Sequence, residues 1–360
     1  MKIKTLILGL ALLLSATSGF AQMWKIENDT LTIRGEGAIP DFTLQTWWDW
    51  PPWLEYQESI TAIVIENGIT RIGDMAFIFL NNVASVSIPN SVTSIGMGSF
   101  GECKSLLSII LPSSITSIGR SALGGCISLV SIDVESENNN YASEDGVLFD
   151  RNKNVLICCP GGKTGNYVIP NSVTTIGSLA FSSCNSLTSV TIPNSVKSIE
   201  DLVFSYCASL ASITLPNNLT SIGDEAFYNC ENLTLITNFN PIPVTINSDV
   251  FKGVNKSACT LEVPINSVSA YKNADVWKEF NIVGVEVGVE ELPMTNDELR
   301  IYPNPTSGKV YIETESEIKV YNQQGELLQE TFGNQIDLSA YPKGVYLLQV
   351  NSKWRKVIKE

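Results

Sequence analysis

The chain has 360 residues, of which 44% are hydrophobic and 17% charged, a composition typical of a folded protein and not of a disordered one. Its net charge of −14 would repel a phosphate backbone, so nucleic acid is excluded as a partner. The chain contains no histidine, which excludes Ser-His-Asp and Cys-His nucleophilic sites, histidine-bound zinc and imidazole acid–base chemistry.

Residues 1–21 have the pattern of a secretory signal peptide. Lys2 and Lys4 precede a short apolar run, and the small residues Gly19 and Ala21 mark a cleavage site before Gln22. The apolar run is too short to serve as a stable membrane anchor. We therefore expect an exported mature chain without a transmembrane anchor.

Residues 22–59 are predicted to form an N-terminal cap. Alternating stretches on either side of Asn28-Asp29 predict a β-hairpin. A tryptophan cluster follows, made of Trp47, Trp48, Trp50 and Trp53. Because the repeated array after it would otherwise have an open end, we expect these rings to plug that end. The alternative is an exposed aromatic platform that stacks on sugar rings.

Residues 60–264 repeat a unit of 23 residues in which apolar positions keep their register. The first apolar position holds Ile72, Ile95, Ile118, Ile176, Ile199 and Ile222. The second holds Phe77, Phe100, Leu123, Phe181, Phe204 and Phe227. One such unit cannot bury its apolar face alone, so the units must stack on one another. The predicted fold is a mainly β solenoid with short helical turns.

Each unit is predicted to open with a short strand, such as Ser189-Val190-Thr191-Ile192, in which Val190 and Ile192 face inward. Proline ends the strand because it has no N–H for the ladder. A second extended segment, a glycine turn and one helical turn at the Ala-Phe pair complete the unit. The outward residues are Ser85, Ser87, Ser108, Ile110, Ser131, Asp133, Ser189, Thr191, Ser212 and Thr214. Ser189, Thr191, Ser212, Thr214 and Asp133 are candidate partner-binding residues, although serine and threonine also simply suit a solvated strand.

A further repeat position is occupied by cysteine, at Cys103, Cys126, Cys184, Cys207 and Cys230. No C-x-x-C spacing occurs, so we expect neither a metal site nor any other cofactor. The prediction is a ladder of buried thiols that pack as small hydrophobes. The alternative is one or two disulfides between adjacent rungs, which lie about 5 Å apart and within disulfide range.

Residues 135–166 interrupt the array. Two apolar stretches on either side of 150–154 predict a protruding hairpin. A loop that interrupts a regular array is a better candidate for partner contact than a regular repeat unit. Tyr141, Asp150 and Arg151 are therefore added to the candidate partner-binding residues. Its acidic and Asn-rich part lacks the residue spacing of an EF-hand calcium loop.

The last part of the chain divides into a cap, a linker and a separate small unit. Residues 265–284 are predicted to cap the solenoid, with an amphipathic helix over 267–280. Residues 285–297 form an acidic linker. Residues 298–360 are predicted to form a β-sandwich with strands at 310–312, 318–321, 336–338, 345–350 and 354–358.

Several phrases of the solenoid are specific. They are Ile-Pro-Asn-Ser-Val-Thr-Ser-Ile-Gly at 88–96, Ala-Phe-x-x-Cys-x-x-Leu-Thr-Ser-Val at 180–190, Ser-Glu-Asp-Gly-Val-Leu-Phe at 143–149 and Ser-Val-x-Ala-Tyr-Lys at 267–272. With them the region resembles the BspA-like leucine-rich repeat proteins. The resemblance implies surface proteins that include adhesins for host matrix proteins, host cells and other bacteria. It brings no shared catalytic residues.

The tail carries Tyr-Pro-Asn-Pro at 302–305, Leu-Ser-x-x-Pro-Lys-Gly-Val-Tyr at 338–346 and a basic end. It resembles the C-terminal sorting domain of the type IX secretion system of Bacteroidetes. The resemblance assigns the sorting signal to Pro303, Asn304, Pro305, Gly308, Gly344, Lys353 and Lys356. It implies contact with the type IX machinery and passage through the periplasm to the outer cell surface, where the chain is attached or released.

Together these features predict a non-catalytic cell-surface binding protein, an adhesin whose partner is a host matrix or cell-surface protein or a bacterial surface. The alternative is a glycan-binding surface protein in nutrient capture. A carboxylate-pair enzyme is the third possibility, and no local motif supports it.

Overall fold

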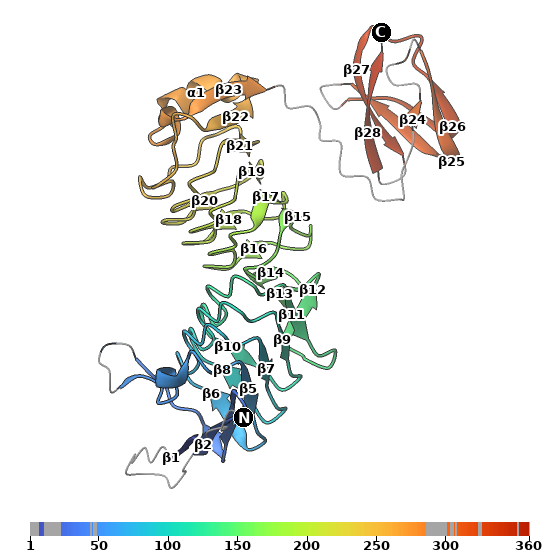
Figure 1. Ribbon diagram of the computed structural model, residues 1–360. Helices are drawn as coiled ribbons and strands as arrows, with labels where there is room; N and C mark the ends of the chain where they lie inside the picture. Colours follow the sequence, from blue (N-terminus) through green and yellow to red (C-terminus); the bar gives the residue numbers. More distant parts are fainter. Residues whose placement is uncertain are drawn as a thin grey trace. The chain divides into compact units, whose positions relative to one another are not determined.

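Figure 1 shows the computed structural model, which describes residues 7–10, 23–43, 45, 49–285, 301, 302, 306, 308–322, 326–350 and 353–359. The chain divides into two compact units, residues 1–286 and 287–360. The first is a β-solenoid, and the second is a small antiparallel sheet with its own core. The predicted fold class is therefore confirmed.

The solenoid begins with a hairpin of β2 (Met23–Glu27) and β3 (Thr30–Arg34). Its turn residues Asn28 and Asp29 both have positive φ, 51° and 61°, as a tight two-residue hairpin turn requires. The hairpin predicted at this position is confirmed. Strand β1 (Ile7–Leu10) pairs with one side of the hairpin, and β5 (Ala62–Ile65) continues it on the other as a parallel neighbour of β3.

The longer strands of successive turns stack in parallel. They are β5, β7 (Ser85–Ser87), β9 (Ser108–Leu111), β11 (Ser131–Val134), β15 (Gly165–Val168), β17 (Leu187–Thr191), β19 (Ser212–Leu215), β21 (Leu235–Asn238), β22 (Thr260–Pro264) and β23 (Asn281–Val285). In β17 and β19, Val190 and Ile213 are paired and buried while Thr191 and Thr214 face outward. The period-2 alternation therefore fixes which side of each strand enters the core.

A second ladder is made of shorter strands. It contains β4 (Gly37–Ala38), β6 (Ile69–Ile72), β8 (Ser94–Ile95), β10 (Ser117–Ile118), β14 (Val155–Cys158), β16 (Thr175–Ile176), β18 (Ser198–Ile199) and β20 (Ser221–Ile222). The glycine that follows many of these strands is needed because neighbouring turns approach closely. A Cβ at Gly96 would lie 2.5 Å from the backbone nitrogen of Asp74.

The predicted helical turn at each Ala-Phe pair is wrong. Met75 and Phe79 have positive φ, 54° and 62°, and the corresponding residues of the other units do the same. In this conformation every second N–H group points to the next turn of the solenoid. Phe77 N donates to Ser99 O at 2.7 Å, and Phe79 N donates to Gly101 O at 2.9 Å. These hydrogen bonds between rungs offset the steric cost of left-handed backbone at residues other than glycine.

Stacked phenylalanine rings fill the core. The centroids of Phe181, Phe204, Phe227 and Phe251 follow one another at 5.0, 5.2 and 5.0 Å, and all four side chains are fully buried. Trp53 lies against Phe77 at 5.6 Å at one end, and Trp277 and Phe280 contact Phe251 at the other. Of the four tryptophans predicted to plug the N-terminal end, Trp53 does so, whereas Trp50 is exposed.

All eight cysteines are free, and seven of them are buried. The ladder thiols donate to carbonyls of the preceding rung: Cys126 Sγ lies 3.1 Å from Phe100 O, and Cys207 Sγ lies 3.0 Å from Phe181 O. The cysteine position thus supplies a small side chain and a directed, weak donor to a buried carbonyl.

The thiols are expected to resist alkylation in the folded protein. Burial raises the pKa of Cys103 to about 12, so at pH 8 the reactive thiolate is a minute fraction. Titration with a disulfide-exchange reagent at pH 8 should modify at most the half-buried Cys158 in native protein and all eight cysteines in urea. Fewer than eight reactive thiols in urea would instead indicate disulfides between rungs.

The hairpin predicted on either side of 150–154 is present, but it does not protrude. It forms a meander of β12 (Tyr141–Glu144), β13 (Val147–Asp150) and β14, and β14 continues the ladder of shorter strands beside β16. Val147, Leu148 and Phe149 are fully buried. Leu148 belongs to the core of the N-terminal turns, and its two neighbours belong to the core of the C-terminal turns. The insert thus joins two hydrophobic cores, because its apolar run points to both sides.

The C-terminal cap contains less helix than predicted. It has α1 (Val268–Asn273) between the 3-10 turns η3 (Ile265–Ser267) and η4 (Trp277–Glu279). The N-terminal cap contains the 3-10 turn η2 (Leu54–Tyr56). The single helix over 267–280 is interrupted because Ala274 is extended and Val276 has φ of 67°. In the described part of the chain no helix is both long and apolar enough to cross a bilayer.

The second unit is one antiparallel sheet, where the sequence predicted a sandwich of shorter strands. Its strands are β24 (Ile301–Tyr302), β25 (Lys309–Tyr321), β26 (Leu327–Asp337), β27 (Gly344–Val350) and β28 (Lys353–Lys359). Strand β25 joins two predicted strands, and β26 was predicted only at its end. Most residues of β26 are polar or exposed, which hides the alternation that marks a half-buried strand.

Candidate binding surfaces

The outward residues of β17 and β19 form ordered columns on the strand face. Ser189 pairs with Ser212 and Thr191 with Thr214 across the parallel ladder. The Thr191 side chain is exposed and the other three side chains are half-buried, so all four residues are at least partly accessible on the strand face. On the next turns Thr237 Oγ1 donates to Glu262 Oε2 at 2.8 Å. The structure brings these four predicted residues together.

Asp133 lies apart from that group, on β11, which belongs to a different sheet. It is exposed, and its Oδ1 accepts a hydrogen bond from Ser131 Oγ at 2.9 Å. The insert borders this strand directly, since Ile132 N donates to Gly146 O at 2.9 Å and Val134 N to Ser143 Oγ at 3.2 Å. Asp133 and the insert therefore belong to one surface, which the sequence treated as two.

Within the insert, the predicted residues have structural contacts. Tyr141 pairs with Asp150 between β12 and β13, and burial raises the pKa of the Tyr141 phenol. Asp150 Oδ1 accepts from Val155 N at 2.7 Å, which closes the turn before β14. Arg151 Nη1 lies 3.5 Å from Ser136 O, and the side chain is otherwise exposed. Arg151 is thus the predicted insert residue most available to a partner.

Three acidic side chains of the insert are engaged within the protein. Glu144 Oε2 lies 2.5 Å from Lys153 Nζ, and Asp145 Oδ2 lies 2.7 Å from Lys163 Nζ. Glu135 Oε2 accepts from Ser113 N at 2.8 Å. These contacts use the carboxylates that a calcium ion would need. Across the described residues, no group of three or more acidic or cysteine side chains is placed to hold a metal.

Asn138 organises the insert and was missed by the sequence analysis. It is fully buried, its amide nitrogen donates to Pro112 O at 2.9 Å and Ile115 O at 3.0 Å, and its oxygen accepts from Asn140 N and Tyr141 N, both at 2.8 Å. Nothing in the run Asn138-Asn139-Asn140 distinguishes the buried asparagine from its neighbours. Its role depends on carbonyls of the preceding turn.

Of the four tryptophans in the alternative glycan platform, the structure describes Trp50 and Trp53. Trp53 is 4% exposed, and its Nε1 donates to Ala76 O at 2.8 Å. Trp50 is 46% exposed, while Trp47 and Trp48 lie outside the described residues. Trp53 cannot stack on a ligand because its ring faces Phe77 and the core. A sugar platform that includes Trp53 is therefore ruled out.

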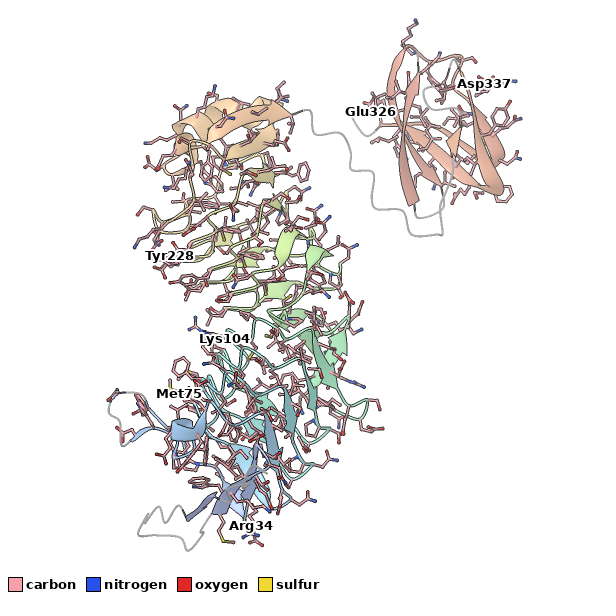
Figure 2. All side chains as sticks on the ribbon, viewed as in Figure 1. Arg34, Met75, Lys104, Tyr228, Glu326 and Asp337 are labelled. Carbon is pink, nitrogen blue, oxygen red and sulfur yellow. The ribbon has the colours of Figure 1, made fainter. Side chains whose placement is uncertain are left out.

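A pair of tyrosines lies on the turns, in which Tyr206 is exposed and Tyr228 is half-buried. The rings of Tyr206 and Tyr228 are 5.3 Å apart in an edge-to-face arrangement, and Lys252 Nζ lies 5.5 Å from the centre of the Tyr228 ring. Figure 2 labels Tyr228 and Met75 on the side of the solenoid away from β9 and β17. The sequence analysis missed this pair because neither tyrosine lies in a strand.

The predicted sorting residues are described only in part. Pro303, Asn304 and Pro305 lie outside the described residues. Gly308 is buried, and a Cβ there would lie 2.3 Å from Ser339 Oγ. Gly344 begins β27, and Lys353 and Lys356 lie on β28 opposite Val350 and Leu347. Lys359 Nζ donates to Ser339 O at 2.9 Å, which ties the last strand to the loop before β27.

Comparison with known families gives two matches. The BspA type leucine-rich repeat region matches residues 54–146 and 159–275, in six copies. The secretion system C-terminal sorting domain matches residues 300–360. The chain matches no curated protein sequence.

Solved structures of bacterial proteins are also similar. A leucine-rich repeat protein of Eubacterium ventriosum is 24% identical with a TM-score of 0.47, over 78% of this chain and 85% of that one. The pneumococcal vaccine antigen PcpA is 17% identical with a TM-score of 0.45, over 80% of this chain and 100% of that one. A leucine-rich cell surface protein of Faecalibacterium prausnitzii is 21% identical with a TM-score of 0.43, over 75% and 98%.

Proposed function

The chain belongs to the BspA-type leucine-rich repeat family of bacterial surface proteins and carries a type IX sorting domain, and from this premise we propose that it is an adhesin. Its partner would be a host matrix or cell-surface protein or the surface of another bacterium. The sorting domain indicates export to the outer cell surface. Passage through the periplasm, and attachment or release at the surface, are part of the same proposal.

The observation that carries the proposal is the strand face of the solenoid. The parallel strands β17 and β19 present small polar side chains in register, and Thr191, Thr214 and Thr237 lie in one column. A surface of this kind is regular, broad and almost uncharged, and solenoids use such extended surfaces for binding. The insert that borders β11 and Asp133 adds the exposed Arg151 as a charged contact.

Glycan binding is the second candidate. The observation in its favour is the Tyr206–Tyr228 pair with Lys252 beside it, because an exposed aromatic ring such as that of Tyr206 can stack on a sugar ring. Trp50 adds an exposed ring in the N-terminal cap. On this alternative the ligand would contact the turns, not the strand face.

The test is binding of the full chain to an array of matrix proteins and glycans. Removing the whole insert is unsuitable, because Val147 and Phe149 are fully buried and their loss would open the core. We therefore compare wild type with R151S and with Y206S/Y228S. Saturable binding to a matrix protein that falls at least severalfold in R151S and persists in Y206S/Y228S is the expected result. Binding to glycans alone, lost in Y206S/Y228S, would replace adhesion by sugar capture.

A further inference from the structure

Three aliphatic side chains interrupt the polar strand face of the N-terminal turns. Leu107, Ile110 and Val130 are 55%, 58% and 56% exposed. They lie on adjacent turns, because Val130 N donates to Leu107 O at 2.9 Å and Ile110 pairs with Asp133 between β9 and β11. Together with Asp133 they form what we call the aliphatic patch.

The same positions are small or polar on β17 and β19, although Val168 beside Thr191 is also exposed. Thr188, Thr191, Ala211 and Thr214 take the places of Leu107, Ile110, Val130 and Asp133 in the repeat. The backbone geometry is the same, since Ala211 N donates to Thr188 O at 2.9 Å and Thr191 pairs with Thr214. The solenoid therefore does not need aliphatic residues at these positions. Each one leaves apolar surface in water that a partner would bury.

The charge around the patch restricts the partner further. Strands β5, β7, β9 and β11 contain no charged residue except Asp133. Asp133 makes a hydrogen bond to Ser131, and among the described residues no base is paired with it. A cationic group placed beside the aliphatic side chains would therefore meet an available carboxylate in a chain of net charge −14.

The insert determines how a partner can approach. Residues Ser143 and Gly146 already bond to the backbone of β11, so the edge of this strand cannot accept an added strand. Figure 1 shows β12 and β13 beside β11. A partner must therefore lie on the face of the sheet, where the side chains of the aliphatic patch project.

We propose that the aliphatic patch, Leu107, Ile110 and Val130 with Asp133, is a docking site for a protein segment that presents aliphatic side chains next to a lysine or arginine. The inference rests on the proposed function only in that the solenoid binds protein. It places the site at the boundary of the N-terminal strand face and the insert. It also assigns separate roles to the apolar side chains, which supply burial, and to Asp133, which selects a base.

The test uses a phage-displayed library of random peptides selected on the immobilised full chain. Enriched peptides should contain aliphatic residues adjacent to lysine or arginine. They should bind L107T/I110T/V130A at least tenfold more weakly than wild type. D133N should weaken binding severalfold and reduce its dependence on salt. T188S/T191S/T214S, which alters the matching positions of the polar turns, should bind as wild type does.

Rebuilding the aliphatic patch on other turns tests whether the loss of binding comes from the patch or from misfolding. Adding T188L/T191I/A211V/T214D to the L107T/I110T/V130A variant rebuilds the aliphatic patch on β17 and β19, and peptide binding should return to within a few fold of wild type. The inference is overturned if no peptides are enriched, or if the selected peptides bind L107T/I110T/V130A as tightly as wild type. If wild type binds nothing on the matrix array but the peptide results hold, the adhesin function fails and the docking site stands. If array binding is unchanged in L107T/I110T/V130A, and the peptides too are unaffected, the docking site fails and the adhesin function stands.

Discussion

Replacing Phe204 by alanine is expected to lower the free energy of unfolding of the solenoid by about 3–5 kcal/mol. The side chain is fully buried between the rings of Phe181 at 5.0 Å and Phe227 at 5.2 Å. Its removal opens a cavity in contact with both neighbouring turns, and the stability of a solenoid is largely a sum of such interfaces. Urea unfolding of the full chain, followed by tryptophan fluorescence, measures the loss.

Two further substitutions separate packing from general damage. F204L introduces the residue that stands at Leu123, the same repeat position, and should lose clearly less stability than F204A. Y206A removes a ring from the same turn that is 50% exposed, and should cost less than about 1 kcal/mol. Equal losses for F204A and Y206A would mean that the phenylalanine stack does not hold the turns together.

Replacing Asn138 by aspartate is expected to destabilise the solenoid by about 2–4 kcal/mol at pH 7. The carboxylate keeps the two bonds from Asn140 N and Tyr141 N but loses both donors. It also places a buried negative charge within about 3 Å of two carbonyl oxygens, those of Pro112 and Ile115. The comparison of urea midpoints for wild type and N138D gives the effect.

The pH dependence of N138D identifies the cause. Burial beside carbonyls favours the protonated acid, so the introduced carboxyl has a folded-state pKa above its unfolded value. Its destabilisation is then full above the folded pKa and declines as the pH falls through it, because the neutral acid can donate one hydrogen bond again. N139D is the matched control, since Asn139 is exposed and should lose almost nothing. A loss in N138D that equals that of N139D at every pH would contradict the buried network.

The sequence by itself determined the stacking of the solenoid. Ile, Phe and Cys recur at 23-residue spacing, and each such position must be buried by the turns above and below it. Phe204, Cys207 and Val190 are accordingly in the core. The hairpin at Asn28-Asp29 was equally predictable, because the positive φ of its turn is a local property that asparagine and aspartate tolerate.

The tertiary structure alone decided which polar and aromatic residues are available to a partner. Trp53 and Trp50 are separated by two prolines in the sequence, yet one is buried against Phe77 and the other is exposed. The run Asn138-Asn139-Asn140 contains one buried and two exposed side chains, and Asn138 alone donates to both the Pro112 and Ile115 carbonyls of another turn. Leu107 and Val130 precede their strands and lie outside the strand alternation, so their exposure is visible only once the turns are stacked. Burial of a repeated position follows from local periodicity, whereas exposure of a unique residue depends on what distant segments cover it.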